Sequence, residues 1–180
     1  SLAKYYDKSL GAQEKYDALD EESIKSFIAK YGSKVKDRDI VGDLYVFCLL
    51  NSMQYSQHTI NVNRQLVSNF IETEPVRNKL KYEASIIQAR YFSSQENCEE
   101  SMSYLQKAET YFNKAQNLDV KEKGVFYYNA GACYLECNQL YLAREKLNNS
   151  LALMKKYLPA NHMILGQINN ALGVLNEDLG

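Results

Sequence analysis

The chain has 180 residues, of which 46% are hydrophobic, and its formal net charge is −1. This length and this hydrophobic content allow a buried core and exclude intrinsic disorder as the main state. The near-neutral charge excludes a bulk attraction to nucleic acid or to an anionic membrane, and no apolar stretch approaches the roughly 20 residues that a bilayer span needs.

Helix-breaking residues are sparse, with two prolines and eight glycines in the whole chain. Runs of alternating β-branched residues are missing, and so are the turn signals that a sandwich or barrel needs. We therefore expect an all-α fold of about nine helices. Because the chain opens on Ser1 and shows no signal peptide, we expect a fragment of a longer, cytoplasmic protein.

The first segment, residues 1–39, predicts two short helices, at about 2–18 and 21–31. A charged link over 33–39 follows them. These helices do not fit the repeat described below, so we treat the segment as a separate N-terminal region.

Residues 40–74 predict a helical hairpin. Its first helix, 40–55, is so rich in apolar side chains that we expect it to be buried on more than one face. Its second helix, 59–72, has Thr59 and Asn63 where the repeat has a small and a large apolar residue. We therefore expect a degenerate repeat unit here.

A spaced pattern of large and small residues begins at Tyr127. In chain order it consists of Tyr127, Ala130, Gly131, Tyr134, Ala143, Leu147 and Ser150. Small residues at 131 and 143 let two helices approach closely, while the larger ones fill the space between them. When 42 is subtracted from the residue number, five of these positions recur in the same size class, as Ala89, Phe92, Ser101, Leu105 and Ala108. This is the pattern of a tetratricopeptide helical hairpin, lengthened from its usual period of about 34 residues.

The two prolines follow the same period. The numbers of Pro75 and Pro159 differ by 84, which is twice 42. Each proline precedes the small residue of its repeat, Ala89 or Gly173, by the same interval. Proline is favoured in the first turn of a helix, so the prolines support the repeat independently of the packing residues.

Helix starts and the last repeat carry further signals. Two cap-x-x-Glu pairs predict helix N-termini, Asn97 with Glu100 and Asp119 with Glu122. The last repeat keeps Gly173 but has Asn176 where the previous one has a tyrosine, and its second helix would lie beyond residue 180. We expect helix 163–179 to be either half of a truncated repeat, prone to dimerise, or a capping helix with Gln167, Asn170 and Glu177 on a solvated face.

Residues 157–180 resemble the long tetratricopeptide repeats of kinesin light chain and its relatives. In those repeats a segment ending in His leads into a helix that carries Asn-Asn, here His162 and Asn169-Asn170. Met163 stands where the family usually has proline. The resemblance implies a right-handed solenoid of antiparallel helix hairpins, with units at 75–117, 118–158 and 159–180.

Catalytic and metal-binding motifs are absent from the sequence. It contains no phosphate-binding loop, dinucleotide fingerprint, zinc-protease motif or nucleophile elbow, and we expect neither an enzyme nor a cofactor. The four cysteines, Cys48, Cys98, Cys133 and Cys137, form no CxxC pair. We expect them to be reduced, mostly buried thiols, with no metal site.

The first helices of stacked hairpins line a concave groove. The expected exposed groove residues are Tyr128, Asn129, Ala132 and Glu136, then Ile86, Ile87 and Arg90, and finally Asn169, Asn170, Val174 and Glu177. The resemblance implies that Asn129 holds the backbone of a ligand, since an amide both donates and accepts hydrogen bonds. The alternative is that Asn129 only caps or solvates its helix. The basic ring of a chaperone carboxylate clamp is missing, which leaves Arg90 as the group to meet an acidic ligand.

These features predict a scaffold that binds a protein, either as an extended peptide or as a partner helix. One alternative is the peptide-sensing domain of a bacterial transcription regulator. Another is an architectural domain that self-associates, for example as a homodimer through the terminal repeat. Direct contact with nucleic acid or a membrane is not expected.

Overall fold

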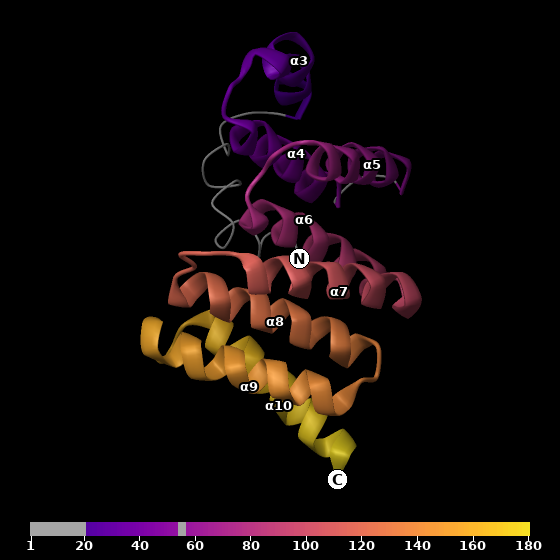
Figure 1. Ribbon diagram of the computed structural model, residues 1–180. Coiled ribbons are helices and arrows are strands. Elements are labelled where there is room, and N and C mark those ends of the chain that lie inside the picture. Colours follow the sequence, from indigo (N-terminus) through magenta and orange to yellow (C-terminus); the bar gives the residue numbers. More distant parts are fainter. Residues whose placement is uncertain (1–20, 54–56) are drawn as a thin grey trace. The chain divides into compact units, whose positions relative to one another are not determined.

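The computed structural model describes residues 21–53 and 57–180, and these residues form helices and no strand (Figure 1). The helices are α3 (Glu21–Tyr31), α4 (Arg38–Ser52), α5 (Gln57–Thr73), α6 (Asn78–Ser94), α7 (Cys98–Lys114), α8 (Val120–Glu136), α9 (Leu140–Tyr157) and α10 (Met163–Leu179), with a short 3-10 turn at Gly32–Lys34. The predicted all-α class is confirmed. The helix predicted at 2–18 lies outside the described residues, and the eight others are present.

The chain divides into two compact units. One holds the described residues up to Ile87 together with Ala108–Ala115, and the other holds Gln88–Lys107 together with Gln116–Gly180. The division passes through α6 and α7, so each of these helices contributes to both units.

The core of the first unit is built around α4. Its buried side chains include Val41, Leu44, Val46, Phe47, Leu49 and Leu50, which cover more than one face of the helix, as the apolar run predicted. A Cβ at Gly42 would overlap the end of the Leu80 side chain, so a larger residue there would force that side chain to move. Ion pairs reinforce the unit, among them Arg38 with Glu74 at 2.7 Å and Arg77 with Asp39 at 2.6 Å.

The core of the second unit lies between α8 and α9. A Cβ at Gly131 would lie 2.8 Å from Leu147 Cγ, and one at Gly124 would lie 2.7 Å from Met154 Sδ. The Ser150 hydroxyl donates to the Gly124 carbonyl at 2.7 Å. These contacts run in opposite order along the two helices, and they confirm the close approach that the small residue at 131 predicted.

The repeat period recurs in the helix boundaries. Helices α6 and α8 begin at Asn78 and Val120, and α7 and α9 begin at Cys98 and Leu140, so the residue numbers in each pair differ by 42. The turn after α6 has Glu96 at φ 59°, and the equivalent turn after α8 has Asn138 at φ 57°, with the same difference in number. This left-handed conformation is uncommon for a residue other than glycine. Its recurrence shows that the two turns share one backbone geometry.

The predicted helix caps are present. Asp119 and Glu122 form a complete capping box at the start of α8. The Asn97 side chain accepts a hydrogen bond from the Glu100 amide at 3.3 Å in the first turn of α7. At α10, His162 is the N-cap residue, and its Nδ1 accepts a hydrogen bond from the Ile164 amide at 3.2 Å. These bonds satisfy amide groups that a helix start leaves without an intrahelical partner.

Helix α10 packs against α9 on one face only. Its buried residues are Ile164, Leu165, Ile168, Leu172 and Leu175, while Gln167, Asn170 and Glu177 are exposed as predicted. A Cβ at Gly173 would meet no described atom within 4 Å, so this glycine makes no close contact with another helix among the described residues.

Candidate functional site

The six predicted site residues lie on three helices. Tyr128, Asn129 and Glu136 are on α8, Arg90 and Ile87 are on α6, and Asn170 is on α10. Ile87 belongs to the first unit, and the other five belong to the second.

Arg90 and Glu136 form an ion pair in the second unit. The guanidinium Nη1 lies 2.9 Å from Glu136 Oε1, and the Ser93 hydroxyl donates to the other carboxylate oxygen. The Arg90 side chain is largely buried, whereas that of Glu136 is about one third exposed. Arg90 is therefore not an unpaired cation in this structure, because Glu136 already balances its charge. A residue 46 positions away supplies this partner, so local sequence spacing could not reveal it.

Asn129 is completely buried, which contradicts its predicted exposure. It shares a helix face with Val125 and Cys133, one turn before and one turn after, and both are also buried. Its Nδ2 donates to the Val125 carbonyl at 2.9 Å. Its Oδ1 accepts no hydrogen bond from any described residue. An unmade bond of this kind costs about 1–3 kcal/mol, so this oxygen is an acceptor in need of a donor.

Tyr128 lies within the electrostatic reach of the same ion pair. Burial raises the pKa of its hydroxyl, Arg90 opposes that rise, and Glu136 adds to it. The side chain is half-buried. The structure therefore brings Tyr128, Arg90 and Glu136 together, with Asn129 next to Tyr128 on the same helix.

The remaining candidates divide by exposure. Ile86 and Ile87 are buried, because every residue of α6 from Tyr82 to Ala89 is buried, and their predicted exposure is wrong. On α10, Asn169, Asn170, Val174 and Glu177 are exposed as predicted.

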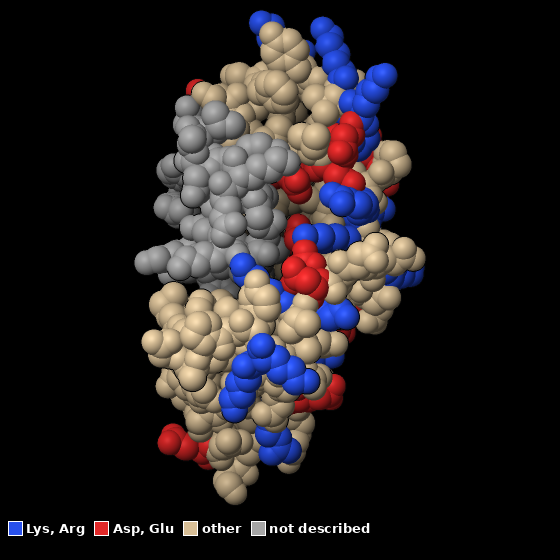
Figure 2. Space-filling model, turned by 90° about the vertical axis from the view of Figure 1, so that its left-hand side faces the viewer, with Lys and Arg blue, Asp and Glu red and all other residues tan. Residues whose placement is uncertain are grey.

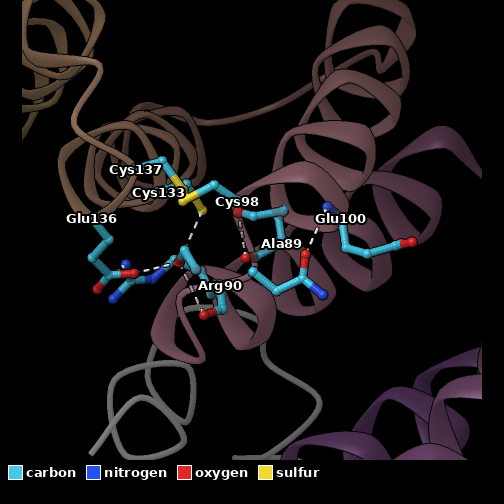
Figure 3. Close-up of a disulfide and its surroundings, with 10 residues drawn as sticks. Ala89, Arg90, Cys98, Glu100, Cys133, Glu136 and Cys137 are labelled. Atoms are coloured by element: carbon cyan, nitrogen blue, oxygen red, sulfur yellow. Dashed lines mark hydrogen bonds and ion pairs between the residues drawn. A yellow bond between two sulfur atoms is a disulfide. The ribbon is translucent and has the colours of Figure 1, made fainter.

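The sequence reasoning missed a disulfide between Cys98 and Cys137, whose Cα atoms lie 5.5 Å apart (Figure 3). The expectation of four reduced thiols is wrong for this pair, while Cys48 and Cys133 are buried and not disulfide-bonded, as expected. Cys98 opens α7 and Cys137 is the C-cap residue of α8. The repeat register could have revealed the pair, because both cysteines flank turns that are equivalent under the repeat period.

Cys133 lies beside the disulfide in Figure 3. The Ser93 hydroxyl is 3.9 Å from its sulfur. Burial raises the pKa of the Cys133 thiol to about 11, although Arg90 opposes the rise. The thiol is therefore protonated at neutral pH, and a protonated thiol is a poor nucleophile and metal ligand.

Charged, metal-binding and membrane-spanning sites each place their own requirements on the described residues. Acidic and basic side chains are interspersed on the face in Figure 2. Among the described residues, no group of His, Cys, Asp or Glu is placed to hold a metal ion. Within this same part of the chain, no helix has both the length and the apolar character that crossing a bilayer requires.

Comparisons with protein-family models, with curated proteins and with solved structures give no match to this chain. Its function is therefore argued from its own residues.

Proposed function

We propose that this chain is a protein–protein interaction scaffold and not an enzyme. It binds an extended peptide or a partner helix on a tetratricopeptide-like array of antiparallel helix hairpins. The observation that carries the proposal is the Asn129 Oδ1 atom, fully buried and without a hydrogen-bond donor among the described residues.

The arrangement of α8 and α9 supports the hairpin architecture. Gly131 faces Leu147 while Gly124 faces Met154, which is the contact order of two helices running in opposite directions. Helix boundaries and turn conformation both recur with the repeat period. Stacked hairpins of this kind form extended binding surfaces.

The chemistry around Asn129 fits a peptide backbone. A backbone N–H would supply the donor that Oδ1 lacks, in any side-chain context. Tyr128 adds an aromatic ring with a polar tip, a residue type that often anchors interfaces. The Arg90–Glu136 pair adds both signs of charge at the C-terminal end of α8, about two turns beyond Asn129. Because Asn129 is buried, the side chains around it must move when a peptide enters, and such rearrangements are common on binding.

We propose the cytoplasm as the location, on the support of two buried thiols outside the disulfide, Cys48 and Cys133. A reducing compartment preserves such thiols. The Cys98–Cys137 bond would then be one that opens and closes with redox conditions.

The test begins with selection from a random peptide library displayed on phage. The affinity of the best peptide is then measured by fluorescence anisotropy for the wild type, Asn129→Ala and Arg90→Ala. Loss of one neutral hydrogen bond is expected to weaken binding by roughly 2- to 10-fold for Asn129→Ala. Arg90→Ala leaves Glu136 without its partner and is expected to weaken binding further.

Asn63→Ala is the matched control. Asn63 is an equally buried asparagine whose Nδ2 also donates to a backbone carbonyl, that of Cys48 at 3.1 Å, but it lies in α5 of the first unit. The Asn63→Ala variant should bind the peptide with the affinity of the wild type. A library that yields no binder, or a peptide that binds all four proteins equally, would contradict the proposal.

A self-associating architectural domain is the second candidate. Exposed apolar side chains on α9 and α10 favour it, namely Tyr141 (72% exposed), Tyr157 (54%), Met163 (56%) and Val174 (48%). Sedimentation velocity over a wide concentration range tests it. A monomer throughout would count against self-association.

A further inference from the structure

The Cys98–Cys137 disulfide joins two equivalent turns of the second unit. Cys98 follows the turn that contains Glu96, and Cys137 precedes Asn138, the residue with the same left-handed backbone one repeat period later. The bond closes a loop that contains the whole of α7 and α8. It is therefore a covalent link between neighbouring helix pairs and does not merely staple one turn.

Three helix ends meet around this bond, as Figure 3 shows. Helix α7 is held to α6 by the Ser101 hydroxyl, which donates to the Ala89 carbonyl at 2.8 Å. Helix α8 is held to α6 by the Arg90–Glu136 pair at 2.9 Å. The disulfide closes the third side, between α7 and α8. Glu136 directly precedes Cys137, so the bond fixes the position of the carboxylate that binds Arg90.

The disulfide is reachable, whereas the neighbouring thiol is not. Cys98 and Cys137 are half-buried, while Cys133 is completely buried. An external thiol can therefore attack the disulfide from solvent. Cys133 attacks the disulfide poorly, since burial raises the pKa of its thiol to about 11 and keeps it protonated.

We propose that the Cys98–Cys137 bond is a reversible redox brace that sets the affinity of the proposed peptide site. Arg90 and Glu136 contribute to this site at the end of α8, and Asn129 contributes about two turns before that end. This inference rests on the peptide-binding function proposed above. In the oxidised state the ends of α6, α7 and α8 are preorganised, and binding costs little further ordering. In the reduced state the ion pair and the hydrogen bonds remain, but the C-terminal end of α8 unfolds locally more often. Peptide binding must then order this end of the helix, and the entropic cost lowers the affinity.

The chemistry is thiol–disulfide exchange with a low-molecular-weight or protein thiol as reductant. Its thiolate attacks one sulfur of the bond, the bond between the cysteine sulfurs breaks, and a mixed disulfide forms while the released cysteine thiolate takes a proton. A second thiol attacks the mixed disulfide, releases the other cysteine, and leaves with the first thiol as their disulfide. Two electrons pass from the two external thiols to the protein.

The experiment uses the full chain in its oxidised and its dithiothreitol-reduced forms. Mass spectrometry after alkylation verifies the state of Cys98 and Cys137. The probe is the best phage-selected peptide, and its dissociation constant is measured by anisotropy. Reduction is expected to weaken binding by roughly 5- to 10-fold, at the low end of typical coupling between sites.

Variants provide matched controls. The double variant Cys98→Ser with Cys137→Ser should bind the peptide with the affinity of the reduced wild type. Its dissociation constant should not change when dithiothreitol is added. Cys48→Ala combined with Cys133→Ala keeps the disulfide and should respond to dithiothreitol like the wild type. The reduced wild type covers the case in which a variant does not fold.

Hydrogen exchange gives a readout that needs no peptide. Amides of α8 from Asn129 to Glu136 are expected to exchange faster after reduction, while those of α4 stay unchanged. Equal exchange in both forms, or a dissociation constant unchanged within about twofold, overturns the redox inference and leaves the proposed function standing. A library that yields no binder to either form overturns the proposed function itself.

Discussion

Removal of the Cys98–Cys137 bond should be among the most destabilising changes in this chain. The perturbation is the double substitution Cys98→Ser with Cys137→Ser, compared with the oxidised wild type. The cysteines are 39 positions apart. For a closed loop of about 40 residues, the chain-entropy relation gives about 13 cal/mol/K, or about 4 kcal/mol at 25 °C.

This magnitude exceeds that of the other link to the end of α8. The Arg90–Glu136 pair has side chains 13% and 36% exposed, and a partly exposed pair contributes at most about 1 kcal/mol. A loss of about 4 kcal/mol is a large part of the roughly 5–15 kcal/mol that stabilises a typical domain. The disulfide is therefore expected to be the stronger of the two links to the end of α8.

The assay is urea denaturation followed by far-UV circular dichroism, with the wild type measured oxidised and reduced. The reduced wild type should match the double variant within about 1 kcal/mol, since both lack the same link. Cys48→Ser changes a buried cysteine outside the disulfide, and it separates this effect from the loss of a core thiol. A difference below about 1 kcal/mol between oxidised and reduced wild type would refute the reasoning.

Three further predictions follow from single contacts. Gly131→Ala should destabilise the fold by about 1–3 kcal/mol, because its Cβ would crowd Leu147. Gly173→Ala adds a Cβ in open space and should stabilise the helix by up to about 1 kcal/mol. If urea denaturation shows that both substitutions change the free energy of unfolding in the same direction, this packing is contradicted. Burial raises the pKa of Cys133 from 9.0 to about 11. The contribution of this thiol to stability is therefore fully present below pH 9 and is lost as the pH rises through about 11. Denaturation at several alkaline pH values should show this loss in the wild type but not in Cys133→Ala. Exposed carboxylates lie close to Cys98 in the chain, at Glu96, Glu99 and Glu100. The rate at which cationic cysteamine reduces the disulfide, relative to the rate for anionic 2-mercaptoethanesulfonate, should therefore fall as the ionic strength rises. A ratio that does not change with ionic strength would argue against this local field.

Local signals in the sequence determined the helices and much of their spacing. Sparse glycine and proline predicted an all-α chain, and the structure confirms it for residues 21–53 and 57–180. The small residue at 131 and the capping pair of Asp119 with Glu122 were predicted correctly. Each of these depends on residues within one helix or one hairpin, so sequence spacing is enough to reveal it.

Only the tertiary structure decided which residues of the candidate site are buried and which are paired. The burial of Asn129 and Ile87 depends on how many helices cover α8 and α6, which the periodicity of a single helix does not specify. The pairing of Arg90 with Glu136 joins residues 46 positions apart, and the disulfide joins cysteines 39 apart. In both cases the partners meet only because successive turns stack at the same end of the second unit, so their chemistry became visible once the helices were placed in space.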